Sequence, residues 1–233
     1  MTWHAKPSGY YGYATNDGKE NIYEMNKFFN NRGYTLQAQA GIIGNVIGES
    51  GLNPWRWQND TYDLSGGYGL FQYTPAQGYI DGGVNLEHYA PNLSVTTITD
   101  GADPKDGIAQ LTAFADNSLG KWMSSCWRTY WDTYEYSELF ELRNRILSVY
   151  GDGYTLTMDD FKGIDNVYNA TFAFLACFEG PAVPNMESRY AYASDVYVYL
   201  KGNTPDNPNP PPNKKKKNAF LYSKFAILCR RYL

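Results

Sequence analysis

The chain has 233 residues and a mass of 26.4 kDa, enough for one domain with a sizeable core and too little for two large ones. Residues 1–200 carry 12 Lys and Arg against 23 Asp and Glu, whereas residues 201–233 carry 8 against 1. The resulting net charge of −11 on the first part argues against nucleic acid as its partner, because phosphate binding needs clustered cations. The sequence also lacks a signal-peptide pattern, an apolar stretch long enough to span a membrane, and the cysteine spacing of a disulfide framework.

Apolar residues at helical spacing predict a mostly helical first part. A first helix is expected from about Ile22 to Phe29, ending at Arg32 and Gly33, and a second begins at the cap Thr35 and ends at residues 49–51. The later helices are expected at residues 104–116, 119–127, 134–149, 164–178 and 186–200.

The segment 55–79 differs from these helices because it is rich in Trp, Tyr, Gly, Asn and Asp. The turn signal at residues 65–67 precedes a strand-like run, residues 68–73. The sequence therefore predicts an α+β fold that is predominantly helical, with a small β-hairpin or sheet inserted directly after the second helix.

The composition changes after residue 202, which predicts three regions. Residues 1–202 form the main domain, and residues 203–213 form a linker with five prolines in eleven residues. Residues 214–233 begin with four lysines and continue as an apolar segment. This last region is either an amphipathic segment for a membrane surface or, as we favour, a remnant or the start of a second region.

Glu49 is the main candidate for chemistry. It falls in the last turn of the apolar helix, where partial desolvation and the negative end of the helix dipole both favour a protonated carboxyl group. A carboxylic acid that keeps its proton near neutral pH is what cleavage of a glycosidic bond requires. An ordinary exposed glutamate at a helix end is the alternative.

Two short motifs decide between these alternatives. Residues 49–54 read ESGLNP, and Gln72 follows Glu49 by 23 residues within the run GLFQ at 69–72. This pair of motifs resembles the lysozyme-like superfamily, with goose-type lysozymes and soluble lytic transglycosylases nearer than hen-type lysozymes. It is most similar to the bacteriophage tail lysozyme family, and the resemblance extends more loosely from about Trp3 to Leu200. The resemblance implies a lysozyme-like domain with Glu49 as the general acid.

The resemblance leaves the second carboxylate open, because Gly67 stands where hen-type enzymes have their catalytic Asp. Asp60 or Asp63, in the loop before the run 68–73, can hold a water for inversion if its distance from Glu49 suits. The substrate's own acetamido group can act as the nucleophile instead. Alternatively, Glu49 removes a proton from the sugar 6-hydroxyl and an anhydro product forms.

Several residues near these motifs are candidates for binding substrate. Glycines at 66, 67 and 69 leave the backbone open to a polysaccharide, and aromatic rings nearby can stack on sugars. Near Glu179 the family has Glu-Arg-Pro, and because Gly180 replaces that Arg, its pairing is either lost or transferred. The substrate-binding residues that we expect are Gln72, Tyr68, Gly69, Trp57, Tyr73 and Glu179.

The sequence shows no Cys/His nucleophile signature, no H-E-x-x-H, no C-x-x-C and no P-loop, so we expect neither metal nor cofactor. The resemblance implies a muramidase that cleaves peptidoglycan glycan strands. Its expected setting is the virion, at a phage tail tip among other tail proteins, after synthesis in the host cytoplasm without a signal peptide. The alternatives are a lytic transglycosylase and a non-catalytic module that binds the cell wall or builds the tail.

Overall fold

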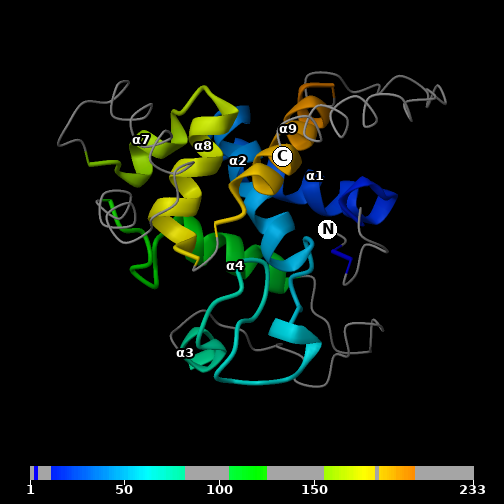
Figure 1. Cartoon of the computed structure of the whole chain (residues 1–233), viewed down its shortest axis with the longest axis vertical. Coiled ribbons are helices and arrows are strands. Elements are labelled where there is room, and N and C mark those ends of the chain that lie inside the picture. The colour runs from blue at the N-terminus through cyan, green and yellow to red at the C-terminus, as the bar shows by residue number, and fades with distance from the viewer. Residues whose placement is uncertain (1–2, 5–11, 82–104, 125–154, 182–183, 203–233) are drawn as a thin grey trace, which may run out of the picture. The chain divides into compact units, whose positions relative to one another are not determined.

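The computed structural model describes residues 3–4, 12–81, 105–124, 155–181 and 184–202, and those up to Lys201 belong to one compact unit. This part of the chain is predominantly helical, as the sequence predicts (Figure 1). Its helices are η1 (Gly12–Ala14), α1 (Asn16–Asn30), α2 (Leu36–Ser50), η2 (Gln58–Asp60), α3 (Ala76–Asp81), α4 (Lys105–Ala115), α7 (Met158–Lys162), α8 (Val167–Phe174), η3 (Leu175–Glu179) and α9 (Met186–Gly202).

Local sequence signals set the two ends of α2 where they were predicted. The Thr35 hydroxyl accepts a hydrogen bond from the Ala38 amide at 3.1 Å, and it also donates one to the Ile164 carbonyl. At the other end Gly51 adopts a left-handed conformation (φ 62°), and its amide bonds the Ile47 carbonyl. These caps place Glu49 in the last turn of the helix.

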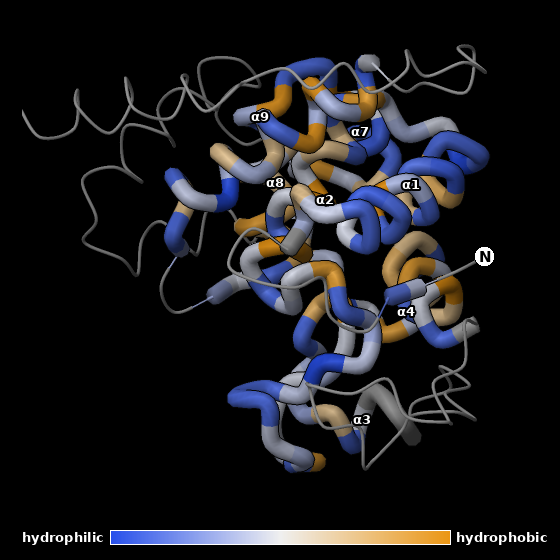
Figure 2. The backbone as a smooth tube through the Cα atoms, turned by 90° about the vertical axis from the view of Figure 1, so that its right-hand side faces the viewer, coloured by the Kyte–Doolittle hydropathy of each residue, from blue (hydrophilic) through white to orange (hydrophobic). Residues whose placement is uncertain are grey.

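Glycines let α8 and α9 approach α2 closely. A side chain at Gly41 would meet the Ala170 backbone of α8 at 2.6 Å, and one at Gly44 would meet Ala193 of α9 at 2.6 Å. α1, the helix that precedes α2 in the sequence, contacts it as well, so helices from both halves of the chain pack around α2 (Figure 1). Hydrophobic residues predominate on α4, whereas α1 carries many hydrophilic ones (Figure 2).

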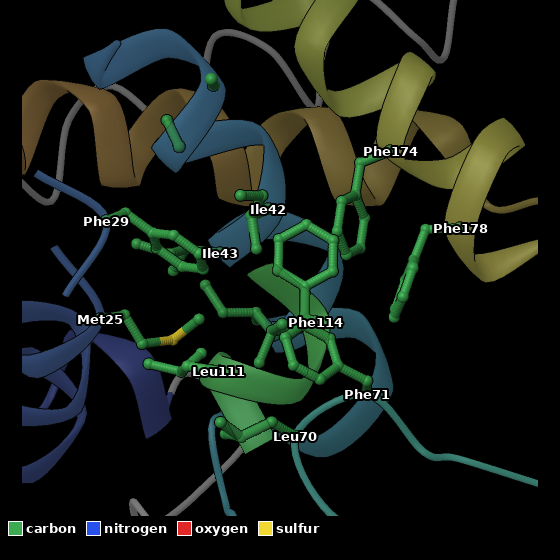
Figure 3. Packing of buried hydrophobic residues seen from close by; sticks show 14 of the residues in the cluster. Met25, Phe29, Ile42, Ile43, Leu70, Phe71, Leu111, Phe114, Phe174 and Phe178 are labelled. Carbon is green, nitrogen blue, oxygen red and sulfur yellow. The ribbon is translucent and has the colours of Figure 1, made fainter. Parts of the chain in front are cut away.

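Four phenylalanines connect the segment after α2 to the helices (Figure 3). Phe71 packs against Phe114 of α4, with ring centroids 5.4 Å apart, and against Phe178 of η3 at 5.3 Å. Phe174 of α8 lies 4.9 Å from Phe178. All four side chains are buried. This cluster fixes the loop that contains Gln72 and the short helix that ends at Glu179.

The expected β-hairpin is not confirmed. Within the described segments there is no strand, and the chain forms two isolated antiparallel bridges, Trp57 with Tyr68 and Tyr68 with Tyr73. The run 68–73 turns back on itself, so the amides of Tyr68 and Tyr73 each bond the carbonyl of the other. Buried Gln110 of α4 bridges this loop, accepting from the Leu70 amide and donating to the Pro54 carbonyl, both at 2.7 Å.

Other helices agree with the sequence only in part. Residues 119–124 are not helical, which contradicts the first half of the helix expected at 119–127, and the helix expected at 134–149 lies outside the described residues. The linker at 203–213 and the segment 214–233 also lie outside them, so the three regions remain a prediction. Among the described helices, none has the length and hydropathy required to cross a membrane.

The close approach of α2 and α9 predicts that Gly44→Ala destabilises the protein. The new methyl group would lie 2.7 Å from the Ala193 backbone nitrogen. We expect the free energy of unfolding to fall by about 1–3 kcal/mol, as for other overpacked cores, in urea denaturation. Gly48→Ala is the matched control, because its methyl group would meet only Arg189, at 3.5 Å. Equal stability of the two variants would contradict the packing argument.

Candidate active site

The carboxylate of Glu49 is paired with a buried arginine. Glu49 lies in the last turn of α2 with a side chain that is 18% exposed, and the Arg189 side chain is 7% exposed. The Nη2 atom of Arg189 donates a hydrogen bond of 2.5 Å to Oε1 of Glu49. The partial desolvation expected from the sequence is therefore present, but it comes with a positive charge that the sequence argument did not include.

Arg189 is itself held by α2 and by the residues that precede α9. Its Nε donates to the Pro184 carbonyl at 2.9 Å, and its Nη1 donates to Oδ1 of Asn45 at 3.1 Å. Asn45 in turn donates to the carbonyls of Gly41, at 2.8 Å, and Thr171, at 3.0 Å. A continuous network of hydrogen bonds thus runs from α8 through α2 to α9 and ends on Glu49.

Glu49 opens onto a polar cavity of about 490 Å³. The residues that line it come from the end of α2, the segment after it and the end of η3. They are Glu49, Arg56, Gln58, Asn59, Gln72, Thr74, Glu179 and Pro181. The cavity therefore brings together the glutamate of the first motif, the glutamine of the second and the more distant Glu179.

Gln72 presents one end of its amide to this cavity. Its backbone has a positive φ of 46°, and its Nε2 donates to the carbonyls of Arg56 and Gly69, both at 3.0 Å. Because both hydrogens of the amide are directed at backbone, its carbonyl oxygen is the atom that can accept a hydrogen bond from a ligand. This arrangement is consistent with the substrate role expected for Gln72.

Gly67 has little room for the side chain that hen-type enzymes carry there. A Cβ atom on Gly67 would lie 3.0 Å from the backbone carbonyl oxygen of Gln72 and 3.1 Å from its side-chain Oε1. The side chain of Gln58 also bonds Gly67, because its Oε1 accepts from the Gly67 amide at 2.9 Å. A side chain at this position would require Gln72 and Thr74 to shift by a few tenths of an ångström.

Glu179 provides a second carboxyl group in the cavity. It ends η3, where Gly180 adopts a left-handed conformation (φ 53°) that favours glycine over the Arg of the family pattern. Its Oε1 is buried and has no hydrogen-bond partner among the described residues. Burial raises the pKa of the Glu179 carboxyl well above its usual range, and the charge of Glu49 raises it further, whereas Arg189 and Lys121 lower it. The sequence suggested a substrate contact for this residue, and the structure adds an electrostatic link to Glu49.

Asp60 and Asp63 each bond a neighbouring residue of their own loop. Asp60 is 47% exposed and pairs with Arg56 at 3.2 Å. The exposed Asp63 carboxylate accepts hydrogen bonds from the Ser65 amide and hydroxyl, at 2.9 and 2.7 Å, and these bonds lower its pKa. Neither residue is among those that line the cavity with Glu49. The idea that one of them is the second carboxylate remains a prediction without geometric support.

The aromatic residues expected on the sugar are in the core instead. Trp57, Tyr68 and Tyr73 are 2% exposed or less, and the rings of Trp57 and Tyr68 pack against each other, 4.4 Å apart. Tyr62, whose ring packs against that of Trp57, is exposed. The space beside Gly69 is filled as well, because a Cβ atom on Gly69 would lie only 2.3 Å from Oε1 of Gln110. These residues shape the loop from within and do not reach the cavity.

The role of Arg189 is the main feature that sequence reasoning missed. A signal was available, because Arg189 shares a buried face of α9 with Ala193, Val196 and Leu200. A charged residue on such a face indicates a buried partner.

In the part of the chain that the structure describes, no cluster of three His, Cys, Asp or Glu side chains forms a metal site.

Comparison with known proteins agrees with the motifs. The family model described as phage tail lysozyme matches residues 20–200. The chain belongs to the phage tail lysozyme family. It is also 27% identical over 177 residues to "Morphogenesis protein 1" of Bacillus phage B103, a match that covers 73% of this chain. The chain spans about a third of that relative, since the match covers 36% of it.

The ion pair predicts a stability loss in Arg189→Met. Removing the guanidinium leaves Glu49 and the Oδ1 of Asn45 without the donor that they share. We expect a loss of at least about 1.5 kcal/mol, and up to about 5 kcal/mol, in urea unfolding at pH 7. Arg56→Met, which breaks an exposed pair, should lose less than about 1 kcal/mol. Adding Glu49→Gln to Arg189→Met should restore part of the loss, and strict additivity would argue against the pairing.

Proposed function

We propose that the protein is a muramidase that hydrolyses the N-acetylmuramyl–N-acetylglucosaminyl backbone of peptidoglycan, with Glu49 as the proton donor. The observation that carries the proposal is that Glu49 and Gln72, one from each family motif, line the same polar cavity. The lining contains amide, hydroxyl, carboxyl and guanidinium groups, which suit the hydroxyls and acetamido groups of a glycan strand.

The chemistry follows from these positions. As the glycosidic bond breaks, the protonated Glu49 carboxyl donates its proton to the leaving oxygen, and water adds to the anomeric carbon. The Gln72 carbonyl oxygen accepts a hydrogen bond from the sugar or from that water. Because Arg189 holds Glu49 in one orientation, the proton donor is positioned before the substrate binds.

The proposed setting is a phage tail. The family is named for tail lysozymes, and the relative in Bacillus phage B103 is named a morphogenesis protein. We propose that the enzyme opens the host wall locally during genome entry and that other tail proteins hold it at the tail tip.

A lytic transglycosylase is the second candidate, and the lack of space for a carboxylate at Gly67 favours it. In that reaction Glu49 acts first as an acid and then as a base towards the 6-hydroxyl, so no water is consumed. A non-catalytic wall-binding module is a further alternative. It would sediment with purified cell-wall sacculi without releasing soluble muropeptides.

Glu49→Gln tests the proton donor, because it keeps the shape of the side chain and removes the acid. We expect the rate of muropeptide release from purified sacculi to fall at least roughly 100-fold, the lower end of general-acid contributions. Glu187→Gln is the matched control, since Glu187 is exposed on α9. Full clearing activity in Glu49→Gln would refute the assignment.

Mass spectrometry of the digest identifies the acceptor. Hydrolysis adds one water to each cleaved bond, whereas the anhydro product lacks that mass. We expect reducing-end muramic acid, in agreement with a hydrolase. Products dominated by 1,6-anhydromuramic ends would show that the enzyme is a transglycosylase.

A further inference from the structure

Two carboxyl groups face one cavity, and their surroundings differ. Glu49 is bonded to the buried guanidinium of Arg189. Glu179 has a buried oxygen, Oε1, without a hydrogen-bond partner among the described residues. Two carboxyl groups that repel each other resist losing both protons, so the pair retains one proton over a wide pH range.

The other charged and titratable groups near Glu179 come from three elements. Arg189 of α9 and Lys121, in the segment after α4, both favour its ionised form. Tyr73, in the loop that follows α2, is neutral because burial raises its pKa, and the charge of Glu179 raises it further. Arg56 also lines the cavity but already pairs with Asp60. Because Glu49 accepts a hydrogen bond from a guanidinium and Glu179 has a buried oxygen without a donor among the described residues, the proton of the pair is assigned to Glu179.

We propose that Glu179 is a proton-relay residue that acts through Glu49: it stores the proton that Glu49 delivers to the glycosidic oxygen. This proposal rests on the proposed muramidase function and extends it. Glu179 also supplies, from the end of η3, a second carboxyl group for the cavity, in place of the one that is absent at Gly67.

The relay balances over one turnover. Glu179 passes its proton to Glu49, and Glu49 passes it to the leaving oxygen as the carbon–oxygen bond breaks. Water then forms the new bond to the anomeric carbon, and the proton that this water loses returns to the Glu179 carboxylate. Glu49 ends as the carboxylate bonded to Arg189, and Glu179 ends protonated, as both began. The net change is the addition of one water to the glycan.

The first test is the pH profile of kcat/KM for Glu179→Gln on solubilised glycan strands. In the wild type the alkaline limb reports the loss of the proton shared by the pair. Glutamine cannot store a proton, so Glu49 must hold it alone beside Arg189. The alkaline limb should move to lower pH by about one unit or more. At pH values above the limb, kcat/KM should therefore be about tenfold lower than in the wild type. Glu187→Gln should leave the profile unchanged.

A purely structural role for Glu179 would give a different result. The rate would then fall equally at every pH without a shift of the limb, and this would overturn the relay. A limb that moves in Asp60→Asn or Asp63→Asn but stays in place in Glu179→Gln would overturn it as well. If the wild type releases no muropeptides, the proposed function and the relay both fail, whereas an active wild type with an unshifted limb removes the relay alone.

The second test follows the Glu179 carboxyl directly and needs no substrate. The ¹³C carboxyl shifts of Glu-labelled protein are followed against pH, and the signal is assigned with Glu179→Gln or Glu179→Asp, whichever folds. We expect Glu179 to titrate well above the usual range of glutamate, and its pKa to fall in Glu49→Gln because the repelling charge is gone. An ordinary titration, or one that Glu49→Gln leaves unchanged, would overturn the relay.

Discussion

The bond between Arg189 and Glu49 ties the fold to the site. A buried guanidinium is costly unless its hydrogen bonds and charge are satisfied, and here the partners are Glu49, Asn45 and the Pro184 carbonyl. These partners come from α2 and from the residues that precede α9. The approach of α9 to α2 at Gly44 brings the arginine within reach of them. Packing of small residues in the core therefore determines where the Glu49 carboxylate points.

The phenylalanine cluster provides the other half of this connection. Phe71 is next to Gln72, and Phe178 is next to Glu179, so the packing of these two rings sets the distance between two parts of the cavity wall. Neither Gln72 nor Glu179 lies in a long regular element. Their positions are fixed by neighbours that are buried, which is how a loop can hold polar groups in a defined geometry.

Sequence patterns predicted those features that depend on neighbouring residues. Thr35 and Gly51 determine where α2 begins and ends, and Glu49 takes its place from them. The partners of Glu49 were not predictable in this way, because Arg189 is 140 residues distant and no local pattern encodes that contact. The aromatic residues show the same limit, since Trp57 and Tyr68 satisfy equally the pattern of a sugar platform and that of a core. Only packing distinguishes the two, and here it buries both rings.

The cavity contains two carboxyl groups, although residue 67 in the loop after α2 is a glycine. Gln72 and Thr74 lie close to Gly67, and its amide donates to the Gln58 side chain, so a side chain at position 67 would disturb the loop. The left-handed Gly180 ends η3 and leaves Glu179 at its last position, where it lines the same cavity as Glu49. One carboxyl group then has an arginine, and the other has a buried oxygen without a partner in the part of the chain that the structure describes. This difference in surroundings, more than the number of carboxylates, is what divides a proton between two similar side chains.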